Sequence, residues 1–168
     1  MKRAMIIMLV SFLVWMSTLG LFSQDQELPD LTGVIDKAPE MAAPGEDLGY
    51  IYVSIKNIGK AAKEKDQNYC VFLILSKDKE IPVARPQMDG KFREDMAIGI
   101  AMCSSRKLKP GKVWKIDRFG EEDRDDQMMI HKDTPPGYYY LAVVVDVDNQ
   151  IQESNEKNNV HFIPLTIM

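Results

Sequence analysis

Apolar and polar residues alternate along several short segments of this chain, and no stretch after the first 23 residues repeats with the period of a helix. Ile51, Val53 and Ile55, for example, alternate with tyrosine, serine and lysine, as in a half-buried antiparallel strand. Gly, Pro, Asn and Asp, the residues that favour turns, bound each segment. The pattern therefore predicts strands at residues 30–37, 48–57, 69–76, 97–103, 113–119, 138–147 and 160–167.

Two segments indicate which strands can lie in the centre of a sheet. Residues 69–76 are apolar on both faces, which predicts a central strand. Pro82 and Pro86 argue against a central strand in residues 81–90. About seven short strands predict an all-β antiparallel sandwich, and a closed barrel is the alternative that the sequence leaves open.

Residues 1–23 have the three-part layout of a secretory signal peptide. Lys2 and Arg3 precede an uncharged apolar run, and small residues including Gly20 and Ser23 follow it. We expect cleavage, which leaves a lead-in at 24–28 and a single domain at 29–168 in a secreted or periplasmic protein. An uncleaved membrane anchor is the alternative, because the run approaches the ~20 residues that span a bilayer.

The charge of the chain limits the classes of partner that it can bind, and its two cysteines bear on the redox state of its compartment. The chain carries 21 Lys and Arg against 25 Asp and Glu, a net charge of −4, which argues against nucleic acid as a partner because phosphate binding needs a positive surface. We also expect no membrane association after signal cleavage. Cys70 and Cys103 either form a disulfide in an oxidising compartment or remain separate buried thiols, and their spacing leaves both interpretations open.

One acidic segment near the C-terminus is a weak candidate for calcium binding, because calcium prefers several oxygen ligands. The candidate ligands are Asp146, Asp148, Asn149, Glu153 and Glu156. An EF-hand is excluded, since Ile151 and Lys157 stand where that loop needs Gly and Glu. The alternative is structural, with Asn and Asp side chains fixing turns through bonds to neighbouring backbone groups.

The sequence lacks the local motifs of familiar catalytic sites. It contains no Gly-x-Ser-x-Gly elbow and no glycine-rich phosphate loop, and its two histidines stand alone. We therefore predict no enzyme and no cofactor other than the candidate calcium. The alternative is an exported enzyme with a site built from loop residues such as Asp78, Glu121, Asp123 and His131.

Three consecutive tyrosines begin the strand at 138–147. Alternation places Tyr138 and Tyr140 on one face and Tyr139 on the other. Exposed tyrosines would suit a sugar or a protein partner, but we expect core positions, with a hydroxyl bonded to the backbone as in the tyrosine corner of immunoglobulin-like folds.

The turn residues and strand ends fall in a distinctive order. They are Pro29-Asp30-Leu31, Pro44-Gly45, Asn57-Ile58-Gly59, Leu75-Ser76-Lys77-Asp78, Leu108-Lys109-Pro110-Gly111, Pro136-Gly137-Tyr138-Tyr139, Val145-Asp146, and Glu153 followed by Asn155-Glu156 and Asn158-Asn159. This set resembles the CARDB domain, the cell-adhesion-related domain found in bacteria, over residues 29–168. The resemblance implies an immunoglobulin-like seven-stranded sandwich on exported bacterial proteins, with a role in adhesion or assembly and without catalytic residues.

Six residues of this set are expected to be structural. Asn57 and Gly59 tolerate the positive φ that ends a strand, Gly137 follows a rigid Pro-Pro turn, and the paired asparagines fix the last connection. The six are Asn57, Gly59, Gly137, Tyr139, Asn158 and Asn159.

Together, these observations predict a non-enzymatic exported module for binding, adhesion or envelope assembly. Its partner would be a protein or a polysaccharide of the cell envelope. A calcium-stabilised adhesion module is the alternative within the same class.

Overall fold

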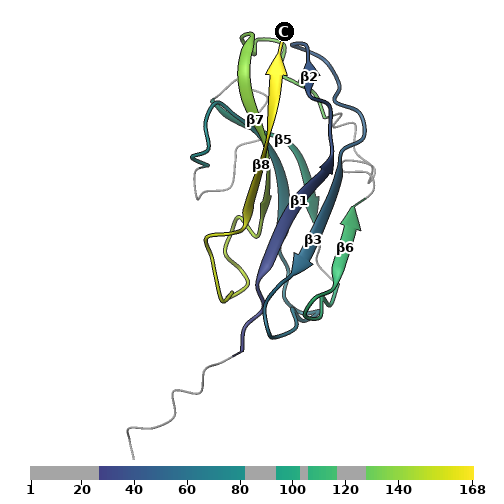
Figure 1. Ribbon diagram of the computed structural model, residues 1–168, viewed down its shortest axis with the longest axis vertical. Coiled ribbons are helices and arrows are strands. Elements are labelled where there is room, and N and C mark those ends of the chain that lie inside the picture. The colour runs from purple at the N-terminus through teal and green to yellow at the C-terminus, as the bar shows by residue number, and fades with distance from the viewer. Residues whose placement is uncertain (1–26, 82–93, 103–105, 117–127) are drawn as a thin grey trace, which may run out of the picture.

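The computed structural model describes residues 27–81, 94–102, 106–116 and 128–168, and it shows two β-sheets packed face to face (Figure 1). The first sheet has the order β1-β3-β6, with β1 at Leu31–Lys37, β3 at Tyr52–Asn57 and β6 at Val113–Ile116. The second has the order β2-β8-β7-β4-β5, with β2 at Met41–Ala42, β8 at Val160–Ile167, β7 at Gly137–Val145, β4 at Cys70–Ser76 and β5 at Asp95–Met102. The predicted all-β sandwich is confirmed.

The main core lies between the two sheets. Alternation sends Val53 and Ile55 inward from β3, and both side chains are fully buried. Leu141 and Val143 of β7 meet them from the other sheet, within one continuous apolar cluster. The residues that alternate with Val53 and Ile55 along β3 are half-buried or exposed and face outward, as predicted for this antiparallel strand.

A second apolar cluster covers the outer face of the five-stranded sheet. Phe72 and Ile74 of β4 and Ala142 of β7 are fully buried there, and Phe162 of β8 packs against them. Strand β4 is therefore buried on both faces and lies between β7 and β5, which confirms its prediction as a central strand.

Strand boundaries differ from the predictions where the backbone turns. The segment predicted at 48–57 becomes a strand only from Tyr52, because Gly49 adopts a φ of +65°. Strand β7 ends at Val145, because Asp146 adopts a φ of +53°. The sequence analysis does not predict the two-residue strand β2. It pairs in parallel with β8, whereas the other strand pairs among the described residues are antiparallel.

Some predicted features lie outside the described residues. These include the signal segment at 1–23, most of the proline-containing stretch at 81–90, and Glu121 and Asp123 of the alternative enzyme site. Within the described ranges, strands are the only extended regular elements, and no helix there is long and apolar enough to cross a membrane.

The two ends of the sandwich have different characters. At the lower end in Figure 1, the start of β1 lies beside the connection between β7 and β8. At the upper end, the C-terminus lies beside β2 and the start of β7. The lower end holds a polar network, and the upper end exposes apolar side chains.

Candidate functional site

Asn57 joins three chain segments at the lower end of the sandwich. Its fully buried side chain accepts backbone N–H groups from Asp30 (3.1 Å) and Gly59 (3.0 Å) at Oδ1. Its Nδ2 donates to the carbonyls of Ala61 and Leu108, both at 2.8 Å. These bonds use both donors and both lone pairs of the amide, so Asn57 fixes the start of β1 against two turns.

Gly59 is required for space. A Cβ at this position would lie 2.5 Å from the backbone N of Asp30 and 2.6 Å from the carbonyl O of Leu28. Neither Asn57 nor Gly59 is among the described residues with positive φ. Tolerance of positive φ is therefore not the reason why Asn57 and Gly59 stand at these positions. Glycine is needed at position 59 because the backbone of residues 28–30 passes too close to it for any side chain.

Asp30 links the start of β1 to the connection between β7 and β8. Its buried carboxylate accepts hydrogen bonds from Ser154 Oγ (2.9 Å) and Asn158 Nδ2 (2.8 Å). Thr32 Oγ1 donates to the carbonyl of Asn158 at 3.2 Å. The first strand and the last connection are thus tied together by side chains.

Glu153 is a buried acid in the same network. One carboxylate oxygen accepts the backbone N–H of Leu31, and the other lies 3.2 Å from Nδ2 of Asn159. Burial, with the nearby carboxylates of Glu156, Asp146 and Asp30, raises the pKa of Glu153 to about 7, although the bond from Leu31 acts in the opposite direction. This acid therefore changes its charge near neutral pH.

Asp146 closes the turn after β7. Its buried carboxylate accepts the backbone N–H groups of Gln150 (3.0 Å) and Ile151 (2.8 Å), and its own N–H donates to the carbonyl of Cys70 at 2.9 Å. Burial raises the pKa of Asp146 despite these two bonds. Asn149, with a φ of +50°, belongs to the same turn.

The calcium candidates thus lie in one turn region, where Asp146 and Glu153 act as acceptors for backbone groups. Glu156 Oε1 likewise accepts the N–H of Glu153 at 2.8 Å. Over the part of the chain that the structure describes, no three His, Cys, Asp or Glu side chains are grouped to hold a metal ion. The calcium site stays a prediction, and the arrangement is that of the structural alternative.

The paired asparagines at the end of this connection contact the two buried acids of the network. Asn158 bonds Asp30, and Asn159 bonds Glu153. The buried Oδ1 atoms of Asn158 and Asn159 have no hydrogen-bond partner among the described residues.

Tyr139 forms the expected tyrosine corner. Its ring is buried in the main core, and its hydroxyl donates to the carbonyl of Pro135 at 2.9 Å. Gly137 has a φ of +154°, which residues with a side chain rarely adopt, so it sets the turn into β7.

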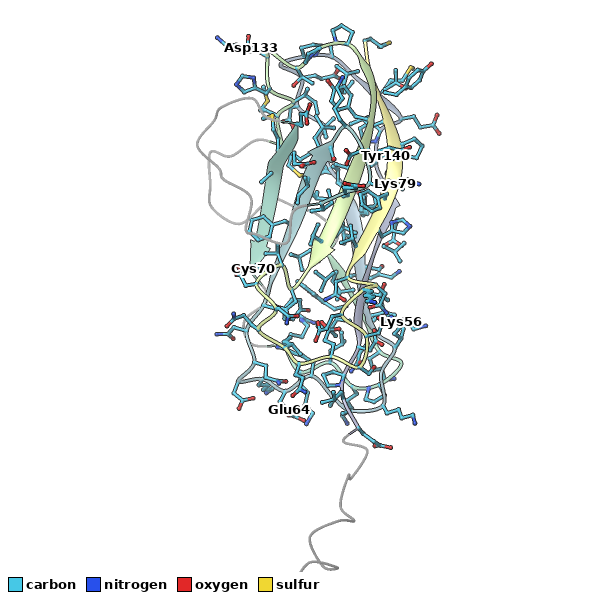
Figure 2. All side chains as sticks on the ribbon, turned by 90° about the vertical axis from the view of Figure 1, so that its left-hand side faces the viewer. Lys56, Glu64, Cys70, Lys79, Asp133 and Tyr140 are labelled. Carbon is cyan, nitrogen blue, oxygen red and sulfur yellow. The ribbon has the colours of Figure 1, made fainter. Side chains whose placement is uncertain are left out.

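Tyr138 and Tyr140 lie on the outer face, so the expectation that these two tyrosines belong to the core is wrong for Tyr138. This residue is 86% exposed, because strand alternation directs it away from the face that Tyr139 fills. Tyr140 is half-buried and packs edge-on against Phe162, with ring centroids 6.1 Å apart. The Lys79 ammonium lies 5.0 Å from the Tyr140 ring centroid, and Figure 2 shows the two side chains together.

The strand register extends this exposed surface across three strands. Thr166 of β8 pairs with both Tyr138 and Met41, which is 56% exposed, and Pro164 pairs with Tyr140. We call this surface the apolar patch, and its members are Met41, Tyr138, Tyr140, Phe162 and Pro164. Sequence reasoning identified the tyrosines but missed Met41, because only the pairing of β2 with β8 brings it there.

The remaining candidates are not brought into one site by the described residues. Cys70 lies opposite Met102 in the β4–β5 register, and Cys103 lies outside the described ranges, so the disulfide stays a prediction. Of the proposed catalytic set, Glu121 and Asp123 also lie outside them. Asp78 accepts the N–H of Glu80 at 2.7 Å in the turn after β4. His131 accepts the N–H of Asp133 at 3.1 Å.

Comparison with solved structures finds similarities at low sequence identity. The CARDB domain of a Pyrococcus furiosus protein in complex with di-metal ions is 20% identical, with a TM-score of 0.48, over 84% of this chain and 94% of that one. A domain of a proposed cell-surface protein from Methanosarcina acetivorans is 17% identical, with a TM-score of 0.49, over 84% and 93% of the two chains. A Listeria innocua β-glucosidase is 14% identical, with a TM-score of 0.44, over 83% of this chain but only 16% of the enzyme.

Comparison of the sequence itself gives a match to a family model over part of the chain. No curated protein matches this chain significantly. The CARDB family model matches residues 100–162, which include β6, the tyrosine corner and the polar connection between β7 and β8. The resemblance to the CARDB family indicated by the ordered motifs is thereby confirmed over residues 100–162.

Proposed function

We propose that this protein is an exported, non-enzymatic binding module that docks a protein of the cell envelope through the apolar patch. The observation that carries the proposal is the 86% exposure of Tyr138 on a sheet surface where Met41 is also exposed. Tyrosine and methionine are enriched at protein interfaces, where they supply large contact areas. The CARDB resemblance supports a cell-surface setting for this role.

The patch is held in shape by the sheet that carries it. Thr166 pairs with Tyr138 on one side and with Met41 on the other, so the backbone that presents these side chains is fixed by strand pairing. A partner therefore immobilises few additional backbone bonds, which lowers the entropy cost of association. Its most exposed members, Met41 and Tyr138, belong to β2 and to the start of β7, which lie at the end of the sandwich away from the start of β1 (Figure 1).

Site-specific photocrosslinking in cells that produce the full chain tests this proposal. A photoreactive phenylalanine analogue replaces Tyr138 in one variant and Ile58, which is 50% exposed at the opposite end, in the control. We expect a discrete protein adduct from position 138 that is absent from position 58.

Three outcomes contradict the proposal. Equal adducts from both positions would show non-specific contact. An adduct of twice the chain mass would identify a second copy as the occupant. Adducts that only glycan-degrading enzymes remove would identify a polysaccharide as the partner.

A further inference from the structure

Residues 106–115 form an exposed basic segment in an otherwise acidic chain. Five of these ten residues are cationic and none is acidic, whereas the whole chain has a net charge of −4. All five cationic residues are exposed. We call them the basic strip, and they are Arg106, Lys107, Lys109, Lys112 and Lys115.

The backbone of this segment is anchored to the fold. Leu108, between two exposed lysines, is only 4% exposed and exchanges two backbone hydrogen bonds with Lys63, both at 3.0 Å. Gly111 donates its N–H to the carbonyl of Asn57 at 2.8 Å, and Asn57 donates its N–H to the carbonyl of Lys112 at 3.1 Å. The cations thus project from an ordered backbone, so a ligand need not order a flexible loop.

Neighbouring side chains extend and orient the strip. Lys56 of β3 is exposed and lies opposite Val113 of β6 in the register. The Arg106 guanidinium lies 5.3 Å from the centroid of the Trp114 ring, a cation–π contact that holds it against the domain. Lys107 is partly neutralised by Glu64, at 2.6 Å, and Figure 2 shows Lys56 and Glu64 in the lower part of the molecule.

We propose that the basic strip binds an anionic polysaccharide of the cell envelope. Its positive charge complements the carboxylate, phosphate or sulfate groups of such a polymer, and several weak contacts add along one chain. The cations continue from the turn at 109–112 into β6, so they follow the end of the sheet and then its face. A flexible polymer follows that bend, whereas a planar membrane contacts only one side of it.

This inference is independent of the apolar patch, since no residue is shared between the two surfaces. Either proposal can fail while the other holds. The Tyr138→Ala variant therefore serves as a control for the basic strip, and it is expected to bind the polymer as the unaltered protein does.

Binding to dextran sulfate, with neutral dextran as the matched probe, tests the proposal on the protein as cells produce it. We expect binding to dextran sulfate alone, with an affinity that falls at least about tenfold between about 50 and about 300 mM salt, because released counterions drive such contacts. The double variant Lys109→Glu with Lys112→Glu is expected to lose about tenfold or more in affinity. The pair Lys132→Glu with Lys157→Glu, at exposed positions outside the strip, causes the same change in net charge and is expected to stay within about twofold.

Several results would overturn the proposal. Equal losses in the two double variants would reduce the effect to net charge. Equal binding to neutral dextran would show that the interaction is not electrostatic. Binding to anionic lipid vesicles in place of dextran sulfate would show that the basic strip contacts a membrane. The unfolding temperatures of both double variants should match that of the unaltered protein. If the charge-reversal variant fails to fold, the triple variant Lys109→Gln, Lys112→Gln and Lys115→Gln, which removes the charges without reversing them, repeats the test.

Discussion

Glu153 accepts the backbone N–H of Leu31 in the interior of the domain, 122 positions away in sequence. This bond connects the first residue of β1 to the segment between the last two strands, and Asn159 contacts the other carboxylate oxygen. The stability of the domain should therefore depend on the charge of one acid.

We predict that the domain becomes more stable as the pH falls from about 8 to about 5.5. The pKa of Glu153 is raised from 4.5 to about 7 in the folded state. At a pH between these two pKa values, the folded protein holds a proton on Glu153 that the unfolded chain has released. The contribution is lost as the pH rises through about 7, and over this interval it amounts to about 2 kcal/mol. Urea unfolding at several pH values measures it.

Glu153→Gln is the matched variant for this prediction. Its neutral amide can accept the N–H of Leu31 at Oε1, and its Nε2 then faces Nδ2 of Asn159, so the Asn159 amide has to turn over to present Oδ1 as the acceptor. With that rearrangement we expect the Glu153 contribution to the pH slope to disappear without loss of stability at pH about 8. The difference between the two proteins isolates Glu153 from Asp146, whose raised pKa acts with the same sign. An unchanged slope in the variant would contradict the assignment.

Asn57→Ala is predicted to destabilise the domain by about 2 to 4 kcal/mol, because four backbone groups lose their partner in a buried site. Denaturant unfolding measures the loss. Asn68→Ala, at an exposed position in the following loop, should change stability by less than about 0.5 kcal/mol. Similar losses in the two variants would show that the network at Asn57 contributes little.

Gly59→Ala is predicted to destabilise the domain by about 2 kcal/mol or more, because the added methyl group would overlap backbone atoms of Asp30 and Leu28 that cannot move independently. The unfolding midpoint in denaturant measures this effect. Ile58→Ala, one residue earlier and half-exposed, provides the control. Wild-type stability of Gly59→Ala would show that the chain before β1 is free to shift.

Tyr139→Phe is predicted to cost about 1 kcal/mol, because the carbonyl of Pro135 loses the hydroxyl that donates to it. Tyr138→Phe removes the same atom from an exposed ring and should leave stability unchanged. Thermal unfolding of the two variants compares buried and exposed hydroxyls one residue apart. Equal effects would argue against a structural role for the tyrosine corner.

The structural interpretation of Asp146 and Glu153, the alternative to a calcium site, predicts that calcium leaves the unfolding temperature unchanged. The Asp146 carboxylate already accepts two backbone N–H groups, and both Glu153 oxygens have partners, so a cation would have to displace these bonds. Thermal unfolding with calcium and with a chelator tests this, since a ligand that binds only the folded state raises the midpoint. A rise that Asp148→Asn abolishes would establish the calcium site.

The local pattern of apolar and polar residues was enough to predict several strands and core positions of this protein. Alternation in 48–57 identified Val53 and Ile55 as core residues, and the doubly apolar run at 69–76 identified the central strand. The same alternation separated Tyr139 from its two neighbours, and the ordered turn residues indicated a resemblance to the CARDB family, which the family model matches over residues 100–162. These inferences succeeded because each depends on a short window of sequence whose period matches one element.

Tertiary structure decided which distant residues meet. Met41 joins the apolar patch only because β2 pairs with β8, and Glu153 meets Leu31 only because the last connection folds beside β1. Gly59 is needed because another part of the backbone passes it, which a preference for turn conformations does not reveal. Sheet order and register are set by the packing of the whole core, so contacts between distant segments cannot be read from either segment alone.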